Sequence, residues 1–74
     1  MSDFKYKDQV VLYPYEPDPQ IYYISMIYQY EVESYLLKSI HDGEIIGRTV
    51  HGNRIKHCTP EMKTKILLGI PLEE

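Results

Sequence analysis

Short apolar runs separated by turn residues fill the first 58 positions of the chain, and this pattern predicts strands rather than helices. The runs are residues 9–13, 20–30, 34–40, 44–51 and 55–58. Pro14, Pro17 and Pro19 lie between the first two runs and predict a rigid loop, because proline lacks the backbone donor that a helix or a central strand needs. Alanine is absent from the chain, which also disfavours a mainly helical protein.

Two glycine-containing turns determine how the predicted strands connect. Asp42-Gly43 lies between two apolar runs and predicts a tight hairpin. Gly52-Asn53 predicts a second tight turn, with a positive φ, before the last short strand. Five short strands with such connections are typical of a mainly β chain. We therefore expect a small five-stranded SH3-like barrel over residues 1–58.

A helix is predicted after the strands. Thr59 supplies a capping hydroxyl, Pro60 occupies the first helical position, and Glu61 places an acid in the first turn. The helix should end near Leu68, with Gly69 in the left-handed cap conformation. One face carries four apolar residues, which are Met62, Ile66, Leu67 and Ile70. Residues 59–74 should pack on the barrel or on a partner, and both self-packing and a homodimer through this face stay open.

Tyrosine is the main aromatic residue, with eight copies against one phenylalanine and no tryptophan. Strict alternation over residues 21–30 would put every second residue on the same strand face. One face would carry Tyr22, Ile24, Met26, Tyr28 and Tyr30, and the other Ile21, Tyr23, Ser25, Ile27 and Gln29. Residues 20–33 contain no lysine or arginine, which disfavours base stacking. A barrel wall or a protein-binding surface is favoured instead. The candidate protein contacts in this strand are Tyr22, Tyr23, Tyr28 and Tyr30.

Charge is distributed unevenly along the chain. The 74 residues carry a net charge of −3, which disfavours general nucleic-acid binding. Residues 44–65, however, hold five lysines and arginines against two acids. The candidate nucleic-acid contacts in this segment are Arg48, His51, Arg54 and Lys56. An ordinary solvated face, whose cations offset the acidic first half, is the competing interpretation.

No residue pattern predicts a catalytic site, a metal site or a cofactor site. His41, His51 and His57 lack the short spacing of a zinc site. Cys58 follows His57 directly, and neighbours on a strand point to opposite faces, so the pair does not predict a catalytic dyad. The single cysteine excludes an internal disulfide and favours a reducing, intracellular compartment. The apolar runs are too short to span a bilayer, so we expect no membrane contact.

Three motifs follow one another between residues 34 and 56. They are SYLL at residues 34–37, the Asp42-Gly43 turn, and VHGNRIK at residues 50–56. The opening, residues 4–13, reads FKYKDQVVLY. Together these segments resemble the carboxy-terminal SH3-like module of gypsy-class LTR-retrotransposon integrases, which carries an SYxL strand, a DG turn, a VHGNRLK ending and an F..GDxVxLY opening. Lys7 stands at the position of that opening's glycine.

The resemblance implies an SH3-like fold without catalysis, because the family's Asp, Asp, Glu metal-binding triad belongs to a ribonuclease-H-like domain too large for this chain. It also implies a nuclear, chromatin-associated context. We expect the module to mediate protein–protein contact, since the chain is acidic and its tyrosine-rich strand lacks cations. The alternative is an accessory nucleic-acid-binding domain of an integrase that uses Arg48, Arg54 and Lys56.

Overall fold

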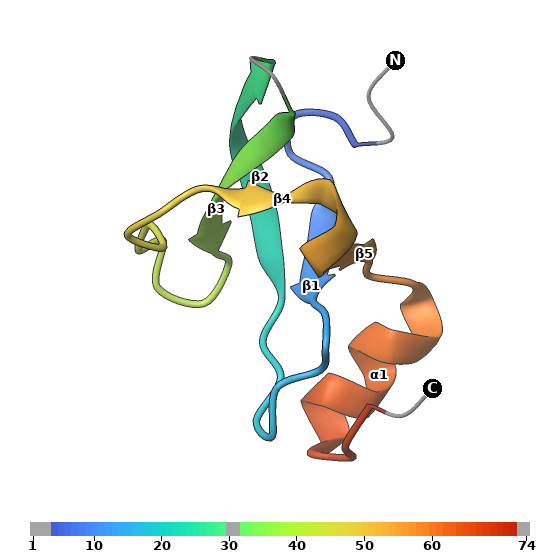
Figure 1. Cartoon of the computed structure of the whole chain (residues 1–74). Helices are drawn as coiled ribbons and strands as arrows, with labels where there is room; N and C mark the ends of the chain where they lie inside the picture. The colour runs from blue at the N-terminus through green and yellow to red at the C-terminus, as the bar shows by residue number, and fades with distance from the viewer. Residues whose placement is uncertain (1–3, 30–31, 73–74) are drawn as a thin grey trace.

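The computed structural model describes residues 4–29 and 32–72, and it places five strands in one antiparallel sheet followed by a short helix (Figure 1). The strands are β1 (Gln9–Leu12), β2 (Tyr22–Gln29), β3 (Glu33–Ser39), β4 (Val50–His51) and β5 (Ile55–His57). A 3-10 turn, η1 (Gly52–Arg54), joins β4 to β5, and the helix α1 (Pro60–Leu68) follows. The predicted mainly β class with one C-terminal helix is confirmed.

The strand order across the sheet is β4-β3-β2-β1-β5, so β4 and β5 are its two edges. The predicted closed barrel is wrong, because no pairing between these edges closes the sheet in the described part of the chain. The reason is local. β4 has only two residues and η1 follows at once, which leaves little backbone for pairing with β5. The sheet curves, and its edges approach each other at η1 (Figure 1).

A hairpin forms at the predicted place, but its loop is longer than a two-residue Asp-Gly turn. The loop is residues 40–43, since the Ser39 N–H donates to the Glu44 carbonyl at 2.9 Å and the Gly43 N–H donates to the Ser39 carbonyl at 2.8 Å. Gly43 ends this loop with a φ of +72°, in the left-handed region. The strand predicted over residues 44–51, however, is reduced to β4 and a single bridge between Ile45 and Lys38. Residues 47–49 leave the sheet, since they are a glycine and two exposed polar residues with nothing apolar to bury.

The core lies on the inner face of the curved sheet. Its largest fully buried side chain is Tyr35, whose ring meets the Phe4 ring edge-to-face with the centroids 5.3 Å apart. The Tyr35 hydroxyl donates to Glu33 Oε2 at 2.9 Å, so this polar atom is satisfied. The other buried members of this cluster come from four strands, and they are Val10, Tyr22, Ile24, Leu37 and Ile55. Burying apolar side chains of this size contributes about 1.5–3 kcal/mol each and stabilises even a small fold.

A β-bulge in β2 changes which residues face the core. The pairing with β3 shifts just after Ile24, so the strict alternation predicted for this strand is wrong. Tyr22 lies before the bulge and is buried in the core. Tyr28 lies after it and on the outer face, because its neighbour Ile27 is directly opposite the buried Tyr35. The two tyrosines therefore do not share a face.

A tight turn forms at Gly52-Asn53 as predicted, but it is the 3-10 turn η1. The φ of Gly52 is not positive, in contrast to Gly43 and Gly69, so the predicted conformation of the turn is wrong. A Cβ added at Gly52 would meet the Tyr35 ring at 3.4 Å, which is an ordinary contact distance. The shape of the VHGNR segment therefore depends on the 3-10 turn and on the adjacent core ring.

The opening turn places a lysine in the left-handed region, since Lys7 has a φ of +67°. The Asp8 N–H donates to the Lys5 carbonyl at 3.1 Å, which makes residues 5–8 a β-turn with Lys7 at its third position. A positive φ at this position normally calls for glycine. The Lys7 N–H donates to the Ile24 carbonyl at 2.9 Å and ties the turn to β2.

The helix α1 has the predicted ends. The Thr59 hydroxyl accepts the Met62 N–H at 3.2 Å and caps the first turn. Gly69 has a φ of +74°, and the Ile70 N–H donates to the Lys65 carbonyl at 2.8 Å, as in a Schellman ending. Both caps satisfy backbone groups that a short helix would otherwise leave without partners.

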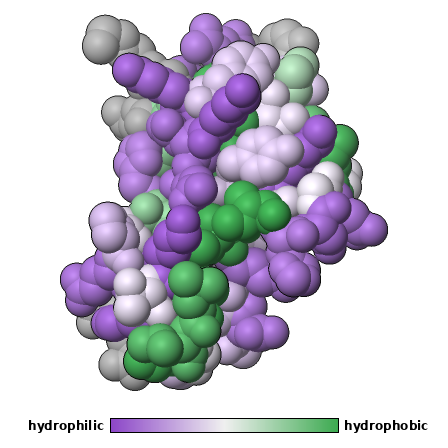
Figure 2. All heavy atoms as spheres, turned by 180° about the vertical axis from the view of Figure 1, so that it is seen from behind, coloured by the Kyte–Doolittle hydropathy of each residue, from purple (hydrophilic) through white to green (hydrophobic). Residues whose placement is uncertain are grey.

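The predicted apolar face of α1 is divided between two environments. Met62 and Ile66 are half-buried, whereas Leu67 is 75% exposed and Ile70 is 45% exposed. Leu68 is also 69% exposed, and Figure 2 shows hydrophobic surface at the helix end of the molecule. The helix therefore leaves part of its apolar surface in contact with solvent.

Candidate functional site

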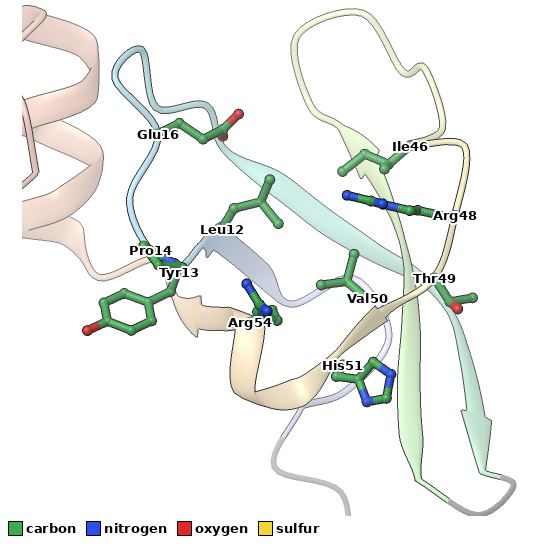
Figure 3. Close-up of a pocket in the computed structure, with 10 residues that line it drawn as sticks. All are labelled: Leu12, Tyr13, Pro14, Glu16, Ile46, Arg48, Thr49, Val50, His51 and Arg54. Atoms are coloured by element: carbon green, nitrogen blue, oxygen red, sulfur yellow. The ribbon is translucent and has the colours of Figure 1, made fainter.

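A groove of about 440 Å³ lies beside η1 (Figure 3). Its walls are the connection that follows β1, the connection that precedes β4, and η1 itself. A volume in this range accommodates a small ligand or a few side chains of a partner. The groove is built from segments that are far apart in sequence and that only the fold brings together.

The floor of the groove is apolar and continuous with the core. Leu12 ends β1, Val50 begins β4, and Ile46 lies in the connection between β3 and β4. All three side chains are half-buried and pack against the buried cluster. An apolar side chain of a ligand would therefore meet a surface that the folded core holds in place.

Two arginines and a histidine from residues 48–54 line the groove. Figure 3 shows Arg48 extending between Ile46 and Val50, with Arg54 on the opposite side of the groove and His51 at one end. Within residues 4–29 and 32–72, neither guanidinium forms an ion pair. Both positive charges are therefore available to an anionic group of a ligand.

Glu16 also lines the groove, but its carboxylate is engaged by a core residue. Glu16 Oε1 accepts the Tyr22 hydroxyl at 3.3 Å. Burial, and secondly the nearby charge of Glu16, raise the pKa of Tyr22 to about 12, so this hydroxyl remains a donor at neutral pH. Figure 3 shows the Glu16 carboxylate directed away from Arg54, and it therefore does not neutralise that side of the groove.

The predicted cationic set is divided by the structure. Three of its four members line the groove, but Lys56 does not. Lys56 Nζ lies 4.0 Å from the centroid of the Tyr13 ring and 5.6 Å from that of Tyr15. The two rings meet edge-to-face at 5.2 Å. Lys56 is thus held in an aromatic cluster next to the groove, and only Tyr13 belongs to both.

The predicted tyrosine set does not form one surface. Tyr22 is only 7% exposed, which corrects its assignment as a protein contact. Tyr23 and Tyr28 are half-buried on the outer face of β2. Tyr30 lies outside the described residues. Of the contacts predicted at the C-terminal end, Leu67 on α1 and Ile70 just after it are accessible, whereas Met62 and Ile66 are half-buried.

Sequence reasoning did not find the apolar floor of the groove. The sequence pattern indicates Leu12 only as a strand residue, and Ile46 lies in the part of the predicted strand 44–51 that is not a regular strand in the structure. A local signal was present in Pro14, which marks the end of β1 and lies in the groove wall. No local signal, however, indicates that this proline lies opposite residues 46–54.

Cys58, a free and half-buried cysteine, is the candidate nucleophile in the described part of the chain. Burial raises the pKa of its thiol, and Lys63 offsets this only in part. The thiol is therefore protonated at neutral pH and is a poor nucleophile. Among the described residues, no three histidine, cysteine or acidic side chains are grouped as metal ligands would be.

Comparisons of the chain with protein-family models, with curated proteins and with solved structures each found no match. The resemblance to retrotransposon integrase modules therefore stays a prediction. In the part of the chain that the structure describes, neither helical segment has the length and apolar character needed to cross a membrane. A functional proposal consequently rests on the groove.

Proposed function

We propose that this chain is a non-catalytic protein-binding module of the SH3-like kind, and that the groove beside η1 receives a short segment of the partner protein. One observation carries the proposal: an apolar floor joined to the core is flanked by two arginines without ion-pair partners in the described chain. Apolar contact would supply affinity, and the charges would orient the bound segment.

The connectivity supports an SH3-like module whose sheet is left open. A short arm, a 3-10 turn and a short last strand follow one another as β4, η1 and β5. The segment 48–56, which carries the resemblance to integrase modules, contributes Arg48 and Arg54 to the groove and Ile55 to the core. On the strength of that resemblance we propose a nuclear, chromatin-associated complex as the setting.

Charge favours a protein partner over nucleic acid. A duplex is bound through several cations that follow its phosphates. The groove offers Arg48 and Arg54, with Glu16 in the same lining, while Lys56 is engaged with Tyr13 outside it. The net charge of −3 adds long-range repulsion, which acts far more strongly on a densely charged duplex than on a short peptide with a few carboxylates. A nucleic-acid-binding accessory domain is therefore the weaker alternative.

The proposal is tested by selecting peptides on the full chain from a displayed library of random sequences. The selected peptides are then mapped through their effect on the backbone amide resonances of the chain. We expect a Kd on the order of micromolar, because so small a contact area is typical of transient complexes. Shift changes should centre on Leu12, Val50 and Arg54 and should leave Tyr23 and Met26 on the outer face unchanged.

Two results would contradict the proposal. Shift changes centred on the outer face of β2 or on α1 would move the binding surface away from the groove. Binding of duplex DNA that is tighter than that of every selected peptide, with a steep salt dependence, would favour the nucleic-acid alternative.

A further inference from the structure

We propose that the groove selects an acidic peptide segment in which one apolar side chain is flanked by carboxylates. This inference rests on the proposed function and specifies the partner's chemistry. The apolar side chain would lie on Leu12 and Val50, and the carboxylates would pair with Arg48 and Arg54.

The local charge of the groove is opposite to that of the whole chain. Arg48 and Arg54 are exposed, and neither has an ion-pair partner within the described residues. The acid in the lining, Glu16, is held by the Tyr22 hydroxyl. The groove therefore has an excess of positive charge on a chain whose net charge is −3. A guanidinium binds a carboxylate through two parallel hydrogen bonds, which makes a carboxylate a well-matched ligand.

The apolar floor distinguishes a peptide from duplex nucleic acid as the source of the anion. Leu12 and Val50 present hydrocarbon surface between the two arginines (Figure 3). In a duplex the bases are stacked inside, and the backbone presents sugars and charged phosphates but no large apolar group to place there. A peptide can place an apolar side chain on the floor and anionic side chains on either side. With a duplex bound, the floor would remain in contact with water. With a peptide bound, an apolar side chain would bury the floor, and this burial would add affinity.

The placement of the two arginines also predicts the order of residues in the ligand. Figure 3 shows Arg48 and Arg54 on opposite sides of the floor. A single acidic residue between the arginines would place a carboxylate, and not hydrocarbon, over Leu12 and Val50. Acids on both sides of a central apolar residue satisfy all three contacts at once. We therefore expect the pattern acid–apolar–acid, with short spacers, and not a simple run of acids.

The test compares two double variants in which two charges are removed. In Arg48→Gln/Arg54→Gln the charges are lost from the groove, and in the matched control Lys5→Gln/Lys63→Gln they are lost elsewhere. All four side chains are exposed, so both variants should fold, and circular dichroism checks this. The probes are peptides selected on the unmodified chain, each paired with its isostere in which Asp and Glu become Asn and Gln.

The selected peptides should carry acids on both sides of an apolar residue. The groove variant should lower their affinity by roughly tenfold or more, because each lost charge-assisted hydrogen bond has an effect of this order. The control should change affinity little. The amide isosteres should bind the unmodified chain more weakly, and the groove variant should weaken them no further.

The other outcomes separate the two proposals. If the selected peptides lack acids but shift the amides of Leu12 and Val50, the acidic preference is wrong and the protein-binding groove stands. If no selected peptide perturbs the groove, both proposals are wrong. If duplex DNA binds and the groove variant reduces its salt dependence, the arginines serve nucleic acid and the acidic-peptide inference fails.

Discussion

Replacing Lys7 by glycine should stabilise the fold. Lys7 adopts a φ of +67° at the third position of the turn formed by residues 5–8, where only its backbone is tied to the sheet. Its side chain is exposed, so the substitution removes no buried contact. Glycine occupies the left-handed region without a steric penalty, and the turn and its hydrogen bond to Ile24 would be retained.

The magnitude follows from two opposing effects. A non-glycine residue in the left-handed region costs about 1–2 kcal/mol. Glycine at the same position adds conformational entropy to the unfolded chain, which costs about 0.4–1 kcal/mol. Taking the middle of each range, the net gain in the free energy of unfolding should be about 0.8 kcal/mol for Lys7→Gly. In a chain of this length that corresponds to a rise in Tm of roughly 3–6 °C.

Urea unfolding and thermal melting, both followed by circular dichroism, measure the effect. Lys7→Ala is the control for loss of charge, because alanine retains the backbone penalty, and its stability should match that of the unmodified chain. Lys5→Gly is the control for added entropy, since Lys5 lies in the same turn without a positive φ, and it should lose stability. If Lys7→Gly is no more stable than Lys7→Ala, the argument from backbone conformation is refuted.

Three further substitutions test other features of the fold. Gly52→Ala should change the free energy of unfolding by less than about 0.5 kcal/mol. Gly43→Ala, at a positive φ, should lose about 0.8 kcal/mol, because alanine lowers the entropy of the unfolded chain and this offsets part of the left-handed penalty. Equal losses in urea unfolding would contradict the conformations described. Tyr22 has its pKa raised from 10.0 to about 12, so its contribution to stability should be complete below pH 10 and lost as pH rises through 12. Tyr22→Phe should lack this alkaline loss when unfolding is measured across the same range. The homodimer predicted through α1 should be disrupted by Leu67→Asp/Leu68→Asp, and sedimentation of the unmodified chain as a monomer at all concentrations would exclude it.

The strands and the helix could be predicted where local signals were strong. The caps of α1 and the hairpin around Asp42-Gly43 depend on residues only a few positions apart. The caps are confirmed, and the hairpin forms with a loop of residues 40–43. The bulge after Ile24 could not be predicted, because apolar and aromatic residues occupy both faces of β2 and either register looks acceptable. Barrel closure was also mispredicted, since it depends on pairing between segments distant in sequence.

The candidate site could be predicted in part for the same reason. Arg48 and Arg54 belong to one short basic segment, and the structure places them around one groove. Lys56 belongs to the same segment, but it lies in β5 opposite Val11 of β1, and its ammonium contacts the Tyr13 ring. The spacing of these cations in the sequence does not indicate which of them line the groove and which lie beside it. The floor residues come from other segments, so only the tertiary structure reveals them.

The order of the strands has a consequence for aggregation. β2 and β3, with eight and seven residues, are the longest strands and lie inside the sheet, whereas the edges β4 and β5 have two and three. Long unpaired edges that carry large apolar residues, such as Tyr35, Leu36 and Leu37 of β3, act as templates for pairing with other chains, and very short edges do not. Loss of residues 50–57 would turn β3 into such an edge. A chain cleaved before Val50 should therefore assemble into cross-β fibres, and would not simply persist as a soluble unfolded peptide.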